Sequence, residues 1–422
     1  MRLFARGEPM HALRLYDSIV SAAPLDFGAR LHVADCLVAV DERELAAEVY
    51  RAVAWYTLKA GHPLTAVVSA RVLEEGLGGE ADDLMAALVV RYGSESELVG
   101  RFAARINVPP DTTQVAPPDL RAPVPDGFAA AAAQRATHCC DDFSEYPEAV
   151  HPIPLLSMLS EEVFRRVLRT LVVRRLPDGT AIIRQGEPGE SFYFVATGEV
   201  RVFVNDAMGR EKELARLHDG SVFGEMALLS AEPRSASVAA AGEADLLEVT
   251  RQSLETLAGE LAPVATALQG FTQERLLKNL MATNRLFRPF DRSQQRDLLR
   301  RFTSHEAMPG TEIIREGSEG TGLFVVLTGE LSVSKAGTPL ATLRAGDLVG
   351  EMSIMAGGPT TATVAAATRA TVLFLAREYV ERMVAGVPEI RDYLQALSED
   401  RSLDTQMAMA DDDVGEDEII FI

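Results

Sequence analysis

The chain has 422 residues, enough for about three domains, with 41 basic and 62 acidic side chains. The net charge of −21 disfavours nucleic acid or an anionic membrane as the main partner, because like charges repel. No apolar run reaches the ~18 residues of a membrane span, and the first residues show no signal-peptide pattern. Three cysteines argue for a reducing compartment. We therefore expect a cytoplasmic protein.

Residues 1–108 are predicted to be helical, because apolar residues recur there at helical spacing. The pair Ala12 and Tyr16 returns 34 residues later as Ala46 and Tyr50. This spacing resembles the second helix of a tetratricopeptide repeat, in which a small residue lets two helices approach closely. The Trp-Leu-Gly part of that motif is absent, so a plain helical bundle remains the alternative.

Residues 109–150 are interpreted as a solvent-exposed linker. Paired prolines at 109–110 and 117–118 oppose a helix and favour extended chain. The alanine-rich run 128–136 is compatible with one short helix. The triplet His138-Cys139-Cys140 does not predict a metal site, because adjacent cysteines do not easily share one ion.

One segment of the chain occurs twice. The octapeptide GTAIIRQG at 179–186 returns 131 residues later as GTEIIREG at 310–317. The block 223–238 returns at 349–364, now 126 residues later. The residues lost between the blocks fall near 205–210, as expected for a hairpin tip that is shorter in the second copy.

Each copy is predicted to be a β-sandwich or jelly roll, because short apolar strands alternate with turn glycines. An amphipathic helix at 161–171 precedes the first copy, and helical sequence resumes over 252–283. The strands expected in the first copy cover 181–184, 192–195, 200–204, 237–240 and 246–249.

The predicted fold class is multidomain α+β: an N-terminal helical-repeat domain, then two β jelly-roll domains with flanking helices. The last segment is acidic, with nine carboxylates from Glu399 onward against Arg401 alone, and such charge blocks are typically disordered. Its apolar end, 418–422, is compatible with a docking peptide or a frayed terminus. The predicted domain limits are 1–108, 109–150, 151–283, 284–397 and 398–422.

The block 223–238 carries residues suited to a phosphate ester. Gly224 allows a close backbone approach, and Glu225 opens a short helical turn whose unpaired N–H groups can bind an anion. Arg234 supplies a planar, permanently charged set of donors, and Ser235 adds a hydroxyl. Since the Glu225 carboxylate suits sugar hydroxyls, the block predicts a nucleotide monophosphate pocket.

This block resembles the phosphate-binding cassette of cyclic nucleotide-binding domains, found in kinase regulatory subunits, gated channels and the catabolite activator family. The resemblance covers about 151–397, and the motifs at 184–191 and 197–199 fit it too. It implies an eight-stranded jelly roll in which Glu225 binds the ribose 2′-hydroxyl, Arg234 the cyclic phosphate, and backbone groups of Gly224 and Ala227 the rest. The first-site residues are Phe223, Gly224, Glu225, Met226, Ala227, Arg234 and Ser235.

The second copy departs from the family pattern because Thr360 replaces the arginine, although Gly350 and Glu351 keep the ribose end. Losing a charge-assisted hydrogen bond to a desolvated phosphate costs about 2–5 kcal/mol. We expect this site to be silent for cyclic nucleotides, to be a structural module, or to be tuned to an uncharged nucleoside. The second-site residues are Gly350, Glu351, Met352, Thr360 and Thr361.

No kinase motif set, P-loop or DNA-reading helix-turn-helix is recognised, so we expect a receptor rather than an enzyme, without cofactor or metal. Its expected ligand is cAMP more than cGMP, and binding would move the helix at 252–283. A protein partner is expected at the N-terminal helices or the acidic tail. The alternatives are a constitutive scaffold, a cyclic dinucleotide receptor, or the regulatory subunit of a separate enzyme. A conventional kinase subunit is disfavoured, because no arginine pair precedes a serine in the linker.

Overall fold

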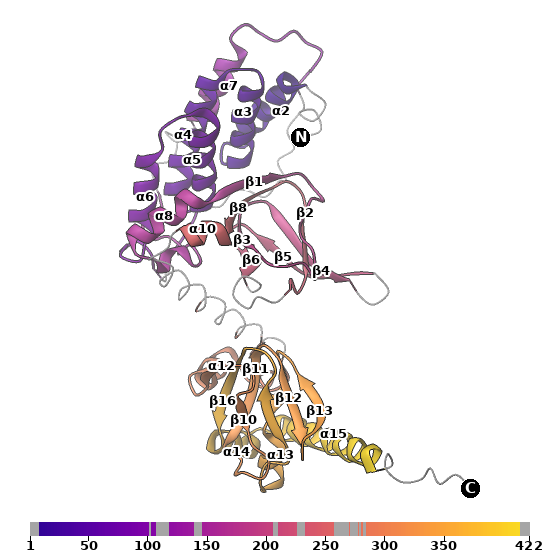
Figure 1. Cartoon of the computed structure of the whole chain (residues 1–422). Coiled ribbons are helices and arrows are strands. Elements are labelled where there is room, and N and C mark those ends of the chain that lie inside the picture. Colours follow the sequence, from indigo (N-terminus) through magenta and orange to yellow (C-terminus); the bar gives the residue numbers. More distant parts are fainter. Residues whose placement is uncertain are drawn as a thin grey trace, which may run out of the picture. The chain divides into compact units, whose positions relative to one another are not determined.

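The computed structural model divides into two compact units, Met1–Phe271 and Thr272–Ile422, each containing one β-sandwich (Figure 1). The described residues are 8–100, 103–106, 118–138, 146–205, 210–225, 233–256, 270, 277, 280–281 and 284–413.

The first unit begins with helices, as the sequence predicts, but they end at Tyr92, so the expectation of helix up to residue 108 is wrong for the described residues 93–100 and 103–106. Prolines at the first turns of α2 and α5, and glycines in the left-handed conformation after α4 and α5, start and stop the helices. Ala46 and Tyr50 are fully buried where consecutive helices pack. The relation of these helices to tetratricopeptide repeats stays a prediction. The helices are α2 (Pro9–Ala22), α3 (Phe27–Ala39), α4 (Arg43–Ala60), α5 (Pro63–Leu77) and α6 (Asp82–Tyr92).

The expected linker contains a docked helix, α7 (Phe128–Thr137), which packs against α2, α3 and α4. The buried Arg30 guanidinium donates to the Ala136 carbonyl at 2.6 Å, and Arg135 pairs with Asp17 at 2.7 Å. This corrects the interpretation of a solvent-exposed linker for 128–137, because the alanine side chains are small enough to enter the helical core. Cys139 and Cys140 lie outside the described residues.

The first barrel follows a 3₁₀ turn, η2 (Leu156–Met158), and helix α8 (Glu161–Thr170). Its antiparallel strands form two four-stranded sheets, β1-β8-β3-β6 and β2-β7-β4-β5, and α10 (Arg251–Thr256) follows them. These two packed antiparallel sheets confirm the predicted β jelly roll. The strands are β1 (Val172–Leu176), β2 (Ala181–Ile183), β3 (Ser191–Thr197), β4 (Glu199–Asn205), β5 (Glu211–His218), β6 (Val222–Phe223), β7 (Ser237–Ala240) and β8 (Ala244–Thr250).

The second barrel repeats this topology strand for strand, with sheets β9-β16-β11-β14 and β10-β15-β12-β13. Its helices are α12 (Arg292–Leu299), α13 (Glu351–Ala356), α14 (Arg377–Gly386) and α15 (Pro388–Asp413). The strands are β9 (Thr303–Ala307), β10 (Glu312–Ile314), β11 (Gly322–Thr328), β12 (Leu331–Lys335), β13 (Thr338–Leu343), β14 (Leu348–Val349), β15 (Thr363–Ala366) and β16 (Ala370–Ala376).

Two further expectations concern the hairpin tip and the tail. The β12–β13 turn consists of Ala336 and Gly337, whereas β4 ends at Asn205 and β5 begins at Glu211, so the shorter tip in the second copy is observed. The expected disorder from residue 398 is corrected for 398–413, which belong to α15. The acidic composition does not prevent this helix, because it packs against the second barrel.

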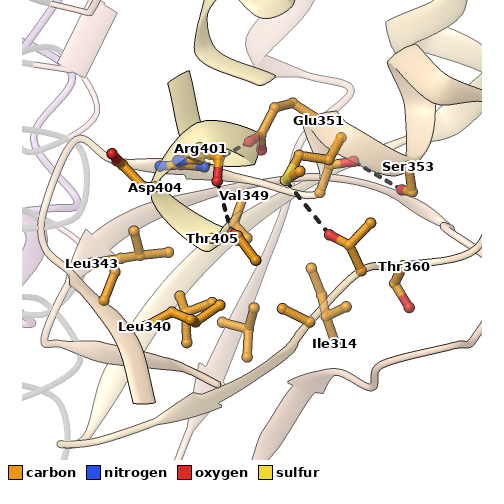
Figure 2. Close-up of a pocket in the computed structure, with 17 residues that line it drawn as sticks. Ile314, Leu340, Leu343, Val349, Glu351, Ser353, Thr360, Arg401, Asp404 and Thr405 are labelled. Carbon is orange, nitrogen blue, oxygen red and sulfur yellow. Dashed lines mark hydrogen bonds and ion pairs between the residues drawn. The ribbon is translucent and has the colours of Figure 1, made fainter. Parts of the chain in front are cut away.

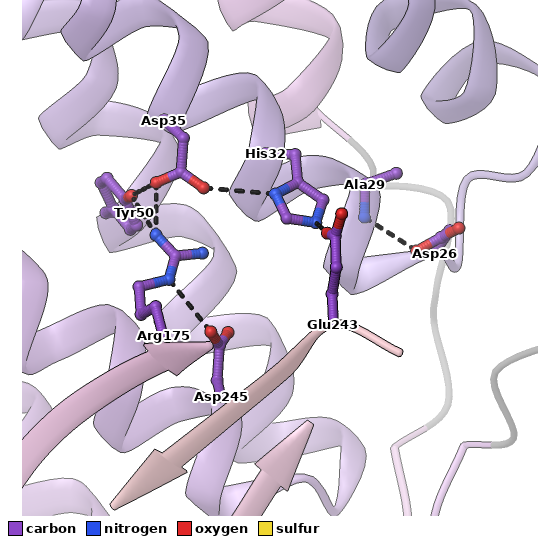
Figure 3. A network of polar contacts seen from close by, with 8 residues as sticks. All are labelled: Asp26, Ala29, His32, Asp35, Tyr50, Arg175, Glu243 and Asp245. Atoms are coloured by element: carbon purple, nitrogen blue, oxygen red, sulfur yellow. Dashed lines mark hydrogen bonds and ion pairs between the residues drawn. The ribbon is translucent and has the colours of Figure 1, made fainter. Parts of the chain in front are cut away.

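The N-terminal helices and the first barrel share one hydrophobic core rather than forming separate domains. Figure 3 shows the polar network at their junction, where Arg175 of β1 binds Asp35 of α3 and Asp245 of β8. His32 bridges Asp35 at 3.3 Å and Glu243 at 3.1 Å. Burial alone would raise the pKa of Asp35, but its contacts with His32, Arg175 and Tyr50 hold that pKa below its ordinary value. The helices therefore brace the first barrel.

Among the described residues, no helix has the length and apolar character needed to span a membrane. Within the same residues, no cluster of three or more His, Cys, Asp or Glu side chains has the arrangement of a metal site.

Candidate ligand sites of the two barrels

A pair of backbone hydrogen bonds fixes the position of Arg234 in the first barrel. The Gly186 N–H donates to the Arg234 carbonyl at 2.8 Å, and the Arg234 N–H donates to the Glu187 carbonyl at 2.8 Å. Arg234 lies three residues before β7, so the turn at 184–187, which follows β2, holds it against the sandwich.

The Arg234 side chain points inward and is 7% exposed. Its Nη1 donates to the Gly224 carbonyl at 2.5 Å, and its Nη2 donates to the Ser191 carbonyl at 2.6 Å. A guanidinium has five N–H donors, so these two bonds leave donors for a phosphate. Burial lowers the pKa of Arg234, but arginine starts so high that the group stays charged.

Gly224 is required by the geometry around this guanidinium. Its φ of +85° is in the left-handed region, and a Cβ there would lie 2.9 Å from Arg234 Nη1. A side chain at this position would therefore push against the cationic group.

Glu225 follows directly and is 2% exposed. It interacts electrostatically with Arg234, so the predicted carboxylate and guanidinium share one site. Phe223 ends β6 and stacks on Tyr193 with ring centroids 5.2 Å apart. Ser235 is exposed, and Met226 and Ala227 lie outside the described residues.

The second barrel has the same backbone frame around Thr360. The Gly317 N–H donates to the Thr360 carbonyl at 2.8 Å, and the Thr360 N–H donates to the Ser318 carbonyl at 2.9 Å. Thr360 is therefore the spatial counterpart of Arg234. Its hydroxyl donates to the Arg315 carbonyl at 2.5 Å, so it is engaged within its own turn.

The residues around Thr360 make hydrogen bonds that differ from those around Arg234. Gly350, with φ of +97°, matches Gly224, and its carbonyl accepts the Ser353 hydroxyl at 3.0 Å. In the first barrel the matching carbonyl accepts Arg234. Met352 lies in α13, and its sulfur accepts the Thr361 hydroxyl at 3.5 Å.

A cavity of about 210 Å³ lies beside these residues in the second barrel. Figure 2 shows Ile314, Leu340 and Leu343 along one side and Glu351 with Arg401 on the opposite side. All five predicted second-site residues line this cavity. Apolar lining residues come from β10, β12, β13, β14 and β15, while α15 supplies Arg401, Asp404 and Thr405.

Arg401 is the residue that sequence reasoning missed. It donates to the Glu351 carboxylate at 2.8 Å and to the Leu348 carbonyl at 2.6 Å. Glu351 is 1% exposed, and its Oε2 has no hydrogen-bond partner among the residues that the structure describes. In the sequence, Arg401 stands out as the one basic residue among the nine carboxylates that follow residue 398. Such a cation is a candidate for pairing with a buried anion.

Comparison with known proteins matches the family described as cyclic nucleotide-binding domain at residues 173–260 and 304–386. A cAMP-dependent protein kinase regulatory subunit from Yarrowia lipolytica is 31% identical over 62% of this chain and 68% of its own length. A cGMP-dependent protein kinase from Toxoplasma gondii is 27% identical over 50% of this chain but only 20% of its own length. The solved structure of the Thermus thermophilus catabolite activator protein is 35% identical and covers 32% of this chain and 67% of its own, with a TM-score of 0.27.

Proposed function

The chain belongs to the family of proteins with tandem cyclic nucleotide-binding domains, which includes kinase regulatory subunits, and we propose that its first barrel alone is a cyclic nucleotide receptor. The observation that carries the proposal is the buried guanidinium of Arg234 beside the buried carboxylate of Glu225. Arg234 would bind the cyclic phosphate and Glu225 the ribose 2′-hydroxyl. The second barrel, with Thr360, would not bind cyclic nucleotides.

Phosphate binding is energetically more favourable in the first barrel, because the Arg234 guanidinium that would bind the phosphate is already buried. A charge-assisted hydrogen bond to phosphate in a buried site is worth more than one in water. The two backbone carbonyls that hold Arg234 also fix its orientation before a ligand arrives, which lowers the ordering cost of binding.

We propose cAMP rather than cGMP as the ligand and a separate protein as the target of regulation. The named relative is a regulatory subunit of a cAMP-dependent kinase, which favours a kinase as that target despite the missing arginine pair in the linker. In this proposal the chain is itself non-catalytic and acts in the cytoplasm.

A short chain of contacts leads from the proposed phosphate site to the helix after the barrel. Arg234 binds the Ser191 carbonyl, and the preceding residue, Glu190, accepts the Arg251 N–H at 2.7 Å and pairs with its guanidinium at 2.9 Å. Arg251 begins α10. We propose that ligand binding at Arg234 shifts this connection and so moves the segment 252–283, most of which lies outside the described residues.

Calorimetric titration of cAMP, cGMP and a cyclic dinucleotide into the whole protein tests the proposal. We expect cAMP to bind most tightly, and Arg234→Ala to weaken binding about 30- to 4,000-fold, corresponding to about 2–5 kcal/mol. Arg166→Ala is the matched control, since its side chain is 51% exposed on α8, outside the proposed site. Thermal unfolding checks that the variants fold, and Arg234→Lys offers a milder change. Unaltered cAMP affinity in both Arg234 variants would refute the proposal.

A further inference from the structure

Tyr193 of β3 is flanked by residues of both neighbouring strands in the first barrel. It stands opposite Glu248 of β8 on one side and opposite Phe223 of β6 on the other. Ser191, two residues earlier on β3, shares its face of the sheet, because side chains alternate along a strand. Tyr193, Glu248 and Ser191 are all buried, so their polar groups need partners inside the protein.

These three side chains form a chain of hydrogen bonds. The Ser191 hydroxyl donates to the Tyr193 hydroxyl at 2.9 Å, which in turn donates to Glu248 Oε1 at 3.1 Å. The other carboxylate oxygen, Glu248 Oε2, accepts a hydrogen bond from Arg174 Nε at 2.7 Å. Burial raises the pKa of Tyr193, so its hydroxyl keeps the proton that it donates. A buried polar chain that is satisfied in this way favours one arrangement of its members.

This chain of hydrogen bonds leads to the carbonyl groups that hold Arg234. The Ser191 carbonyl accepts Arg234 Nη2 at 2.6 Å, so the chain fixes the residue that provides this acceptor. The Gly224 carbonyl accepts Nη1, and Gly224 follows Phe223, whose ring stacks on Tyr193. Tyr193 therefore contacts Ser191 by a hydrogen bond and, by stacking, the residue next to the second acceptor.

The corresponding positions of the second barrel do not form such a chain. Phe324 of β11 is the counterpart of Tyr193, because it has the same partner strands in the same register. Its partner on β16 is Phe374, the counterpart of Glu248, and the two rings lie 4.9 Å apart. Neither phenylalanine can donate or accept a side-chain hydrogen bond of this kind.

Gly322 takes the position of Ser191, and a side chain does not fit there. A Cβ at Gly322 would lie 2.6 Å from Phe374 Cε2 and 2.2 Å from the Leu375 carbonyl oxygen. The barrel with Thr360 in place of the arginine therefore also lacks the two hydroxyls and the carboxylate at these three positions. The two differences occur together, as expected if the hydrogen-bond chain serves the guanidinium.

We propose that Tyr193 is a positioning residue, which holds the backbone acceptors of Arg234 so that the guanidinium meets the cyclic phosphate in one orientation. Ser191 and Glu248 complete the hydrogen-bond chain that keeps Tyr193 in place. The inference rests on the proposed function of the first barrel. A binding group that is ordered in advance costs less to order on association, so loss of the chain should weaken binding although the cation remains.

Calorimetric titration of cAMP into the full chain tests this role with substitutions that each remove one hydroxyl. We expect Tyr193→Phe to weaken cAMP binding about tenfold, because buried groups lose their hydrogen-bond partners, and Ser191→Ala to weaken it in the same direction. Tyr50→Phe is the matched control, since it also removes a hydroxyl bound to a carboxylate, that of Asp35, but at the junction with the N-terminal helices (Figure 3). It should leave the cAMP affinity unchanged. Thermal unfolding checks that all three variants fold.

A double-mutant cycle with Arg234→Lys separates positioning from a merely structural role. If Tyr193 acts through the guanidinium, Tyr193→Phe should weaken cAMP binding by less than about threefold in protein that already carries Arg234→Lys. An equal loss in both backgrounds would overturn the proposal. Unaltered cAMP affinity in both Tyr193→Phe and Ser191→Ala would overturn it as well.

Nitrogen-15 NMR of the ligand-free protein reports on the guanidinium without cAMP. The Arg234 Nε signal, assigned by its absence in Arg234→Lys, should shift in Tyr193→Phe and stay in place in Tyr50→Phe. An unmoved signal in Tyr193→Phe would overturn the inference even if cAMP binds to the wild-type protein. If the signal shifts but the wild-type protein binds no cAMP, the proposed function fails and the positioning of Arg234 by Tyr193 stands, so the two failures are distinguishable.

Discussion

The two barrels have the same strand order and the same backbone frame around positions 234 and 360, yet the arginine near the buried glutamate comes from a different element in each. In the first, Arg234 of the repeated block binds the Gly224 carbonyl. In the second, Ser353 binds the matching Gly350 carbonyl, and the cation comes instead from Arg401 of α15. The two copies thus share the backbone of the site and differ in side chains at a few positions, which we propose set the ligand that each site accepts.

The two arginines, Arg234 and Arg401, are expected to have different roles in their barrels. Arg234 lies within the proposed site, so it retains donors for a ligand. Arg401 comes from another element and pairs with the buried Glu351 carboxylate at 2.8 Å, so we expect it to stabilise the second barrel. The following variants test this difference.

The largest expected effect on stability is that of Arg401→Ala. Glu351 would remain as a buried charge without its partner, which costs about 3–5 kcal/mol. Chemical denaturation, followed by hydrogen exchange of β11 and β16 amides, measures this loss in the second barrel. Arg382→Ala is the control, because its pair with Glu378 is 65% and 68% exposed and should be worth less than about 1 kcal/mol. Equal effects of the two variants would contradict the stabilising role of Arg401.

Thr360→Arg should convert the second barrel toward the chemistry of the first. The backbone frame already matches, so the new guanidinium would be placed near the Gly350 carbonyl in competition with Ser353. In protein that also carries Arg234→Ala, we expect cAMP affinity to rise at least tenfold, or about 1.4 kcal/mol. Calorimetry measures the gain, and Thr363→Arg, at the start of β15, is the control for added charge. If Thr360→Arg bound cAMP no more tightly than Thr363→Arg, the missing arginine alone would not explain why the second barrel does not bind cyclic nucleotides.

Gly224→Ala tests whether the close contact between the Gly224 backbone and the Arg234 guanidinium matters for binding, and its expected effect is smaller. Gly224 and Gly220 have φ of +85° and +86°, but a Cβ at Gly220 meets nothing within 4 Å. Both substitutions carry a similar backbone cost of about 1–2 kcal/mol. Only Gly224→Ala should also weaken cAMP binding, which titration of the two variants measures. Equal cAMP affinities would mean that the Gly224 contact does not position the guanidinium.

The smallest expected effect is the acid sensitivity of the junction that braces the first barrel. The pKa of Asp35 is lower in the folded state, so its stabilisation is present above the unfolded pKa and is lost as pH falls through the folded value. Denaturation of the first unit between pH 7 and pH 3 should show this loss as a fall in the free energy of unfolding. Asp35→Asn should flatten that part of the profile. An unchanged acid limb would argue against the network in Figure 3 as a stabilising contact.

The sequence predicted those parts of the molecule that depend on neighbouring residues. The repeated blocks identified both barrels, and the residues at 225, 234 and 360 indicated their different sites, because these positions lie within one short block. Arg401 was missed because it enters the cavity from a helix 50 residues after Glu351, in a segment whose composition is typical of disorder. The docking of α7 was missed because an alanine-rich helix gives little amphipathic signal, although its small side chains allow close packing.

The most direct test of the account is the number of cyclic nucleotides bound per chain, counted by native mass spectrometry at saturating cAMP. The account predicts one in the wild-type protein, none in Arg234→Ala and one in Glu351→Gln. Two bound nucleotides in the wild-type protein, or a single one that is lost with Glu351 instead of Arg234, would contradict it.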